Sequence, residues 1–404
     1  MRQSYWFLPG LMALGGLVAA LGLVFLDGYV GDAWLGRFEW ITGSRPEGAR
    51  AVLSTVASST ITVAGVVFSI TLAAVTYASG QYGPRLLSNF QRDRGNQATL
   101  GTFVATYLYC LVVLRTIRSA EEASADTGGA IRDAFVPHIA VYGALLLAIA
   151  SIAVLVYFVH HVTDGIHINN VIARIGRGLI EAIRARPERD GSPPPDMPGF
   201  ASACTIHGAG TGYIEAIDHD ALVAFACRHD FQFRLLRRAG DFVHAGRPLL
   251  QASPESVAGK KTADACNAAF ALGRRRTPLQ DLRFLFDELV EIAARALSPG
   301  IQDPFTAIAC LDWLGAALSE LDGRGEESVF CDANGVPRLF RKPLDFEDHL
   351  GRAFGQLRPY LAADPNARAH GLATLQAVAN SVRDPRRRGL VLEERRELEE
   401  ASTD

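Results

Sequence analysis

The chain has 404 residues and a formal net charge of −3, which excludes the strongly basic surface typical of nucleic-acid-binding proteins. Its apolar residues are concentrated in a few long segments of the first part of the chain. The composition therefore favours a membrane protein with a separate polar part, and the length leaves room for two or three domains.

Four segments before position 164 contain no Asp, Glu, Lys or Arg. They are residues 3–26, 51–84, 95–114 and 134–163. Each segment has at least 20 residues, and about 20 helical residues cross a hydrocarbon core of about 30 Å. We therefore expect a domain of four transmembrane helices over residues 1–163, followed by a soluble part.

The orientation is predicted from arginines and cysteines. With the N-terminus inside, the arginines near the segments favour the inner side only slightly. The six cysteines occur singly, without a CxxC motif, which is typical of a reducing compartment. We expect a protein of the bacterial cytoplasmic (inner) membrane with both termini in the cytoplasm.

The second segment carries small and hydroxyl-bearing residues at steps of three and four. These positions, called the stripe below, are Thr55, Ser58, Thr62, Gly65, Ser69, Ala73, Thr76 and Gly80. Such spacing places them on one face of a helix. The stripe can pack against other helices of the same chain, line a pore shared by several copies, or bind a lipid or small molecule.

The charge pattern in and after the four segments restricts the class of transport protein and predicts where the second helix ends. No charged residue lies deep in any of the four segments, which argues against an ion-coupled transporter. Pro84 is expected to bend or end the helix. Arg85, Arg92 and Arg94 follow it, and we expect them at the inner membrane surface, as topology anchors or as a vestibule that attracts anions.

The end of the fourth segment carries a candidate metal site. His160, Asp164 and His167 are spaced i, i+4 and i+7, so they share one helical face. Imidazole and carboxylate groups in this arrangement can hold Zn²⁺ or respond to pH near neutrality. His161 is a possible further ligand, and histidines at the membrane surface without a bound metal are the alternative.

The soluble part is predicted to contain several regions. Residues 164–200 are expected to form a juxtamembrane helix and a Pro/Gly linker, and residues 201–257 a small β-module. Residues 258–385 are expected to be mostly helical, with Asp303 and Pro304 starting a helix and a hairpin at Asn334 and Gly335. Residues 386–404 are predicted to form a charged tail, either a solvated helix or disordered. The fold class is therefore an α-helical membrane domain followed by a cytoplasmic α+β domain.

Four blocks of the sequence resemble a known family. They are residues 68–114, "YFVHHV" at 157–162, "GYIEAID" at 212–218 and residues 295–314. In this order they resemble the domain-of-unknown-function 2254 family of predicted bacterial membrane proteins, over nearly the whole chain. The resemblance implies an integral membrane protein with a cytoplasmic domain, and it implies no activity and no catalytic residues.

The motifs favour a membrane assembly over an enzyme. A nucleophile elbow, a Walker loop, HExxH and GxGxxG after a strand are absent in context, so we expect no enzyme, no cofactor and no nucleic-acid partner. The leading hypothesis is an oligomeric passive channel with a cytoplasmic assembly and gating domain, whose partners are the lipid bilayer and further copies. The alternative is a non-conducting scaffold or signalling protein whose soluble domain binds a partner. The ion or small-molecule ligand stays open.

Overall fold

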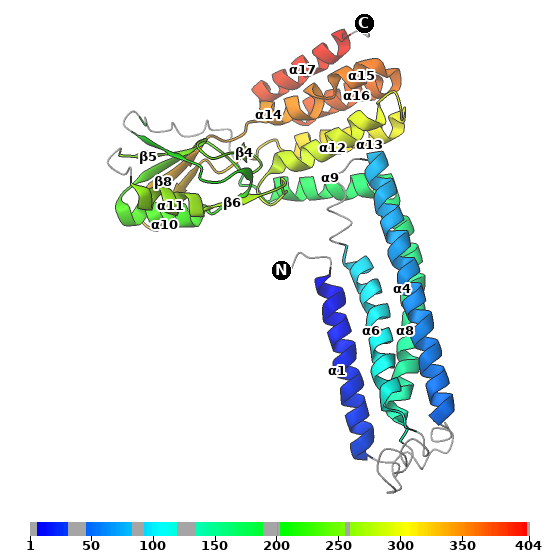
Figure 1. Cartoon of the computed structure of the whole chain (residues 1–404). Coiled ribbons are helices and arrows are strands. Elements are labelled where there is room, and N and C mark those ends of the chain that lie inside the picture. The colour runs from blue at the N-terminus through cyan, green and yellow to red at the C-terminus, as the bar shows by residue number, and fades with distance from the viewer. Residues whose placement is uncertain are drawn as a thin grey trace. The chain divides into compact units, whose positions relative to one another are not determined.

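The chain divides into two units in the computed structural model, Met1–His167 and Ile168–Asp404 (Figure 1). The structure describes residues 6–30, 46–82, 93–118, 135–188, 200, 203–254 and 259–401. The first unit contains the uncharged segments, and the second contains the α+β part. The predicted order, an α-helical membrane domain followed by an α+β domain, is therefore confirmed.

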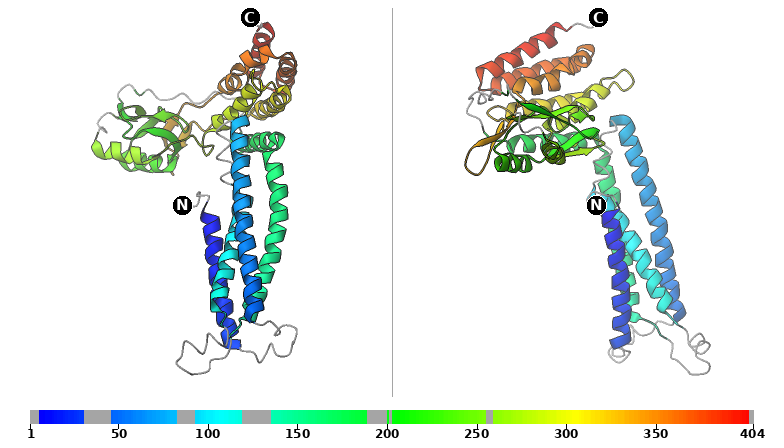
Figure 2. Two further views of the ribbon diagram at one scale, coloured as in Figure 1. Left: turned by 45° about the vertical axis from the view of Figure 1, so that its right-hand side comes forward. Right: turned by 60° about the vertical axis from the view of Figure 1, so that its left-hand side comes forward.

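Four long helices form the described part of the first unit. They are α1 (Phe7–Val30), α4 (Pro46–Tyr82), α6 (Arg94–Thr116) and α8 (His138–Ile166). Each is long and apolar enough to cross a membrane, which confirms the four predicted spans. Figure 2 shows them running side by side, and α6 packs against each of the other three. At 37 residues, α4 rises about 55 Å, so it exceeds the hydrocarbon core.

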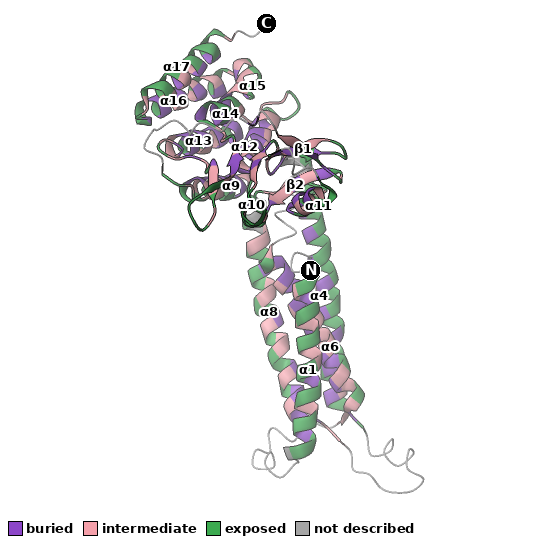
Figure 3. Ribbon diagram, turned by 90° about the vertical axis from the view of Figure 1, so that its left-hand side faces the viewer, coloured by how far each residue is buried: buried purple, intermediate pink, exposed green. Residues whose placement is uncertain are grey.

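One face of α4 packs inside the bundle and the other is exposed (Figure 3). Leu53 and the small residues Ala49 and Ala57 belong to a buried cluster that contains Tyr109 of α6. Further along, Ala64 and Val67 pack in a second cluster with residues of α6 and α8. Alanines let the α4 backbone approach the aromatic side chains of its neighbours.

The second unit begins with α9 (Ile168–Arg184), which packs against α12 (Leu282–Ala296) and α13 (Pro304–Glu320). Its apolar residues recur at helical spacing, and Ile172, Leu179 and Ile183 are buried. Gly176 lies directly against the ring of Trp313, so a Cβ at this position would collide with the ring. The predicted juxtamembrane helix thus packs one of its faces inside the second unit.

Further helices cover α13. They are α14 (Phe346–Leu350), the π-helical turn Gly351–Gly355, α15 (Arg358–Ala363), α16 (Pro365–Ser381) and α17 (Pro385–Glu400). α13 begins at Asp303, whose side chain accepts the amide of Thr306, with Pro304 in the first turn. This confirms the predicted cap. α17 occupies most of the predicted charged tail, yet it buries Val391, Glu394 and Leu398, and it packs on α16.

The strands form two small sheets. The five-stranded sheet has the order β1 (Cys204–His207), β5 (Pro248–Ser253), β3 (Gln232–Leu235), β8 (Pro337–Arg341) and β7 (Val329–Cys331). The three-stranded sheet has the order β4 (Phe242–Val243), β2 (Gly212–Ile217) and β6 (Phe270–Gly273). β3 and β8 pair in parallel, and the other pairs are antiparallel.

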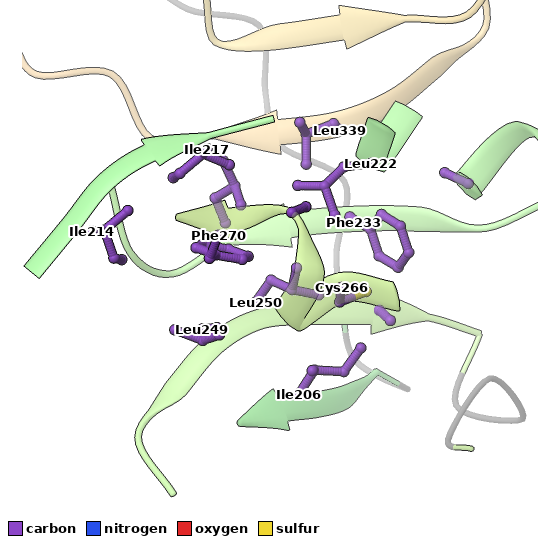
Figure 4. Close-up of a cluster of buried hydrophobic side chains, with 14 of the residues drawn as sticks. Ile206, Ile214, Ile217, Leu222, Phe233, Leu249, Leu250, Cys266, Phe270 and Leu339 are labelled. Carbon is purple, nitrogen blue, oxygen red and sulfur yellow. The ribbon is translucent and has the colours of Figure 1, made fainter. Parts of the chain in front are cut away.

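The core of this β-region combines both sheets and two helices. Ile214 of β2, Leu250 of β5 and Leu339 of β8 lie in one buried cluster (Figure 4). Leu222 in the same cluster belongs to α10 (His219–His229), a helix in a region where the sequence predicted strands. α11 (Lys260–Ala268) contributes Cys266. Because β7 and β8 form the predicted hairpin at Asn334 and Gly335, a segment outside residues 201–257 completes the sheet.

Candidate functional site

The stripe lies on the surface of the first unit. Every one of its positions is exposed: Thr55, Ser58, Thr62, Gly65, Ser69, Ala73, Thr76 and Gly80. The buried positions of α4 form a second series: Ala49, Leu53, Ala57, Thr60, Ala64, Val67, Thr71 and Ala74. At 3.6 residues per turn, the centres of the two series lie roughly half a turn apart. The stripe therefore faces away from the helices packed against α4.

The hydroxyl groups of the stripe are bonded within their own helix. Thr55, Thr62, Ser69 and Thr76 each donate to the carbonyl four residues earlier, and Ser58 donates to the carbonyl three residues earlier. The donor–acceptor distances run from 2.8 to 3.1 Å. Each hydroxyl thus has a partner for its proton, and its oxygen can still accept a hydrogen bond. Such a face can meet another helix or water.

Packing of the stripe within one chain, an alternative from the sequence, does not occur among the described helices. The reason is that α4 packs through its alanine face, which the spacing of hydroxyl-bearing residues does not reveal. Ala57 and Ala64 bring α4 close to α6 and α8. Pore lining between copies and binding of a lipid or small molecule stay predictions.

The predicted basic cluster is described only in part. Arg94 is the first residue of α6 and its side chain is exposed. Arg85 and Arg92 lie outside the described residues, as does Pro84. The vestibule therefore stays a prediction.

The predicted metal site does not form in the described part of the chain. Nε2 of His160 lies 3.4 Å from Oδ2 of Asp164, and both side chains are largely exposed. His167 is the residue after the end of α8, and the backbone becomes extended there before α9 begins at Ile168. The described residues hold no group of three His, Cys, Asp or Glu residues arranged to bind a metal ion.

His161 forms a polar contact that the sequence did not predict. Its Nε2 lies 2.8 Å from Oδ2 of Asp93, and its ring stacks on Tyr157 with the ring centroids 5.2 Å apart. Asp93 also caps α6, because its Oδ1 accepts the amide of Gly95 at 2.8 Å. A Cβ at Gly95 would lie 2.6 Å from His161 Nε2. The pair ties the start of α6 to α8, and the capping pattern of "DRGNQ" is the signal that could have found Asp93.

Asp27 forms a second unpredicted contact, in the last turns of α1. Its two carboxylate oxygens accept the amides of Ile139 and Ala140 at 2.9 Å each. These amides belong to the first turn of α8, where helix geometry leaves them without carbonyl partners. The hydroxyl of Tyr109 donates to the Ala140 carbonyl at 2.8 Å. The carboxylate of α1 thus supplies the hydrogen-bond acceptors that the N-terminus of α8 lacks.

The second unit buries a network of ion pairs between α12 and its surroundings. Asp281 is 3% exposed and accepts hydrogen bonds from Arg276 and Arg283. Asp287, one helical turn and a half further along, accepts from Arg276 and Arg352 at 2.5 Å each. Each carboxylate therefore joins two guanidinium groups. The network links α12 to the π-helical turn that contains Arg352.

A second ionic group surrounds Glu326. Its carboxylate accepts from Arg186 at 3.1 Å, from Arg238 at 3.5 Å and from the Leu344 amide at 3.0 Å. Burial acts to raise the pKa of Glu326, but the positive charges of Arg341 and Arg186 outweigh it and hold that pKa below its usual value. Glu326 therefore stays ionised at neutral pH.

One buried histidine, His349, and one half-buried histidine, His219, lie close to these charges. His349 stacks on Phe286, and neither of its ring nitrogens has a hydrogen-bond partner among the described residues. Burial, and then the charge of Arg186, lowers its pKa to about 3. His219 stacks on Phe330, and burial together with Arg341 lowers its pKa to about 4. Both imidazoles are neutral at neutral pH.

Comparison with known proteins agrees with the resemblance seen in the four blocks. Residues 2–377 match the family described as "Predicted membrane protein (DUF2254)". An uncharacterized protein of Mycobacterium tuberculosis (strain CDC 1551 / Oshkosh) is 33% identical over 354 residues, which cover 85% of this chain and 66% of that relative. Uncharacterized proteins of Mycobacterium bovis and of the H37Rv strain of Mycobacterium tuberculosis give the same figures. The matched part thus spans slightly less than two thirds of these relatives. No solved structure gives a significant match.

Proposed function

The chain belongs to the DUF2254 family of predicted membrane proteins, and we propose that several copies assemble in the bilayer through the stripe of α4 to form a passive pore. The observation that carries the proposal is the exposure of all eight stripe positions on the face opposite to the packed alanines. In this assembly the second unit connects the copies and gates the pore.

The composition of the exposed surface of α4 supports contact with other copies. Large apolar residues such as Ile61, Phe68 and Ile70 are exposed beside the stripe, as expected for a surface against lipid. The stripe itself offers lipid only small side chains and hydroxyl groups. Small residues allow close approach of a second helix, and exposed hydroxyl oxygens can solvate water or ions in a shared space.

The absence of charged residues from most of α4 supports passive conduction. The segment from residue 51 to residue 84 contains no Asp, Glu, Lys or Arg. Proteins that couple transport to protons or ions keep ionisable residues inside the membrane, where they are costly. A face with hydroxyl groups alone can pass a solute down its gradient, but it has no group that stores a proton or a counter-ion.

The orientation and compartment belong to the same proposal. We place the protein in the bacterial inner membrane, with both termini in the cytoplasm, because its six cysteines occur singly and the arginines near the spans slightly favour this orientation.

A non-conducting scaffold is a second candidate, and one observation favours it. The stripe hydroxyls donate to carbonyls of their own helix, so the stripe has no proton donors that require water. Two copies of α4 can therefore meet along a dry interface that leaves no pore. In that case the second unit binds a partner and the membrane helices only assemble it.

A matched pair of tryptophan variants tests the pore. Ser69 lies on the stripe, while the neighbouring Ile70 is 45% exposed on the apolar flank. We expect purified full-length protein to carry current across planar bilayers, Ser69→Trp to abolish it, and Ile70→Trp to leave it unchanged. Mass measurement in detergent and in lipid would check that both variants have the same oligomeric state as the wild type.

The outcomes separate the two candidates. A wild-type protein that is oligomeric but silent under voltage, tension and pH changes supports the scaffold. Equal loss of current in both variants would show that the pathway does not follow the stripe. A wild-type protein that is monomeric in both detergent and lipid would rule out the pore and the stripe-mediated assembly.

A further inference from the structure

A cavity in the second unit is lined mainly by positive charge. Its volume is about 290 Å³, and two leucines line it together with five cationic residues. The cationic residues are Arg234, Arg237, Arg238, Arg341 and Lys342. They come from two short stretches that are about 100 residues apart in the sequence and that the sheet brings together.

The sheet topology explains this convergence. β3 and β8 are parallel neighbours, with Leu235 opposite Arg341. Both strands end at the cavity. The residues that follow them therefore lie at the same edge of the sheet, and they include Arg237 and Lys342. The cavity is thus a cleft formed by strand ends.

The positive charge of the cavity is only partly compensated. Among the lining cations, Arg238 forms a salt bridge with the Glu326 carboxylate, which also forms one with Arg186. Arg237 donates to the Pro248 carbonyl, and Arg341 donates to the Glu327 carbonyl. Neither of these two forms a salt bridge with a carboxylate of the described residues. Backbone carbonyls orient both guanidinium groups, and the Glu326 carboxylate, which already contacts Arg186 and Arg238, offsets the charge of Arg341 only in part.

The pKa of Arg238 reflects the positive charges around the cavity. The pKa of Arg238 is lowered, first by burial and also by the nearby charges of Arg283 and Arg341. Glu326 and Asp241 offset part of this lowering. Cations held close together in excess of the nearby anions repel one another, and a bound anion reduces that repulsion. Guanidinium groups offer paired N–H donors that match the oxygens of a phosphate group.

We propose that this cavity binds a phosphate group, carried by a small soluble phosphate ester or by a lipid headgroup. Arg237, Arg341 and Lys342 contact the phosphate oxygens, and the two leucines contact the apolar part of the ligand. The volume lies at the lower end of the usual range for ligand pockets, roughly 300–1,000 Å³, so the site takes one or two phosphate groups with a small attached moiety. The site is independent of conduction through the membrane unit.

Titration calorimetry on the full-length protein in a neutral detergent tests the site. The probes are inorganic diphosphate, ADP and dihexanoyl phosphatidic acid, with dihexanoyl phosphatidylcholine as the control lipid. We expect diphosphate to bind the wild type, and Arg237→Gln to weaken that binding at least about tenfold, because each charge-assisted hydrogen bond contributes that much. Lys342→Gln, at an exposed position, is expected to weaken it in the same direction.

A matched variant and the choice of probe separate the outcomes. Arg228 is exposed on α10, does not line the cavity and donates to the Ala224 carbonyl of its own helix, so Arg228→Gln should leave binding unchanged. Tighter binding of phosphatidic acid than of ADP would identify a lipid headgroup, and the reverse would identify a soluble ester. No heat with any phosphate probe, or equal weakening by the Arg228 and Arg237 variants, would overturn the proposal.

Discussion

The two units satisfy their buried polar groups in different ways. In the membrane unit, the buried hydroxyls of Thr60 and Thr71 in α4 donate to carbonyls of their own helix, and Asp27 accepts the first-turn amides of α8. In the soluble unit, Asp287 bonds to two guanidinium groups, one of them 65 residues away in the sequence. The membrane unit thus relies mainly on backbone partners for these groups, with side-chain pairs such as His161 and Asp93 beside them, while the second unit relies on charged side chains.

This difference follows from the two solvents. Hydrocarbon offers no hydrogen bonds, so each polar group in a span needs a partner close by, and charged side chains are costly there. A soluble domain can bury charges where several arginines surround each carboxylate. The cost of removing a partner should therefore be greatest in the soluble ion-pair network and smaller for backbone capping in the membrane unit.

The largest effect is expected from Asp287→Ala. Its side chain is 10% exposed, and its removal leaves the mostly buried guanidinium groups of Arg276 and Arg352 partly unpaired. Breaking a buried pair from one side costs about 3–5 kcal/mol. Hydrogen exchange of the α12 amides in the full-length protein would measure this loss in the soluble unit alone.

An exposed hydrogen bond between a histidine and an aspartate provides the control for this prediction. His370 Nε2 lies 2.7 Å from Asp312 Oδ1, and the Asp312 side chain is 61% exposed. Asp312→Ala should therefore cost about 1 kcal/mol or less. Similar losses in the Asp287 and Asp312 variants would mean that burial does not set the strength of these pairs.

A pH-dependent effect of intermediate size is expected from His349. Its pKa in the folded protein is about 3, below the ordinary value of 6.5, so between these values the unfolded chain binds a proton that the folded chain does not. Stability should fall as the pH falls, by about 1.4 kcal/mol per unit in this window. Between pH 6.5 and pH 4.5 the His349 contribution is about 2 kcal/mol.

His349→Phe removes this titration while keeping a ring against Phe286. Thermal unfolding of the soluble unit should then depend less on pH over the same window. His219→Phe should have a similar but smaller effect, since the folded pKa of His219 is about 4. An unchanged pH slope in the His349 variant would show that its imidazole is not held neutral by the fold.

The sequence was sufficient for features that depend on local patterns. The uncharged segments predicted the four spans, and Asp303 followed by Pro304 predicted the start of α13. The sequence was insufficient where tertiary contacts determine the secondary structure. α10 was missed because "ALVAF" in residues 221–225 has the composition of a strand, while Asp218 caps it as a helix by accepting the Ala221 amide.

The candidate sites show the same limit. The spacing identified the stripe as one face of α4, but the packed face was hidden because alanine gives no clear signal in an apolar segment. The spacing of His160, Asp164 and His167 assumed a continuous helix, and α8 ends at Ile166. The partners of His161 and Asp27 are 68 and at least 112 residues away, so no local pattern could have paired them.

The smallest effect is expected from Asp27, and it tests how the membrane unit completes a helix end. Asp27→Ala removes both acceptors of the Ile139 and Ala140 amides, and loss of a helix cap costs about 0.5–2 kcal/mol. Hydrogen exchange at these two amides should accelerate accordingly, while the amides of α12 in the soluble unit stay unchanged.

Asp27→Asn separates capping from charge, because the amide keeps one acceptor oxygen of similar shape. If the hydrogen bonds hold the first turn of α8, the asparagine variant should exchange more slowly than the alanine variant at Ile139 and Ala140. If the negative charge beside the helix N-terminus is what matters, both variants should exchange equally fast. Exchange at the wild-type rate in both would show that Asp27 does not cap α8, and the membrane unit would then hold a buried carboxylate for another purpose.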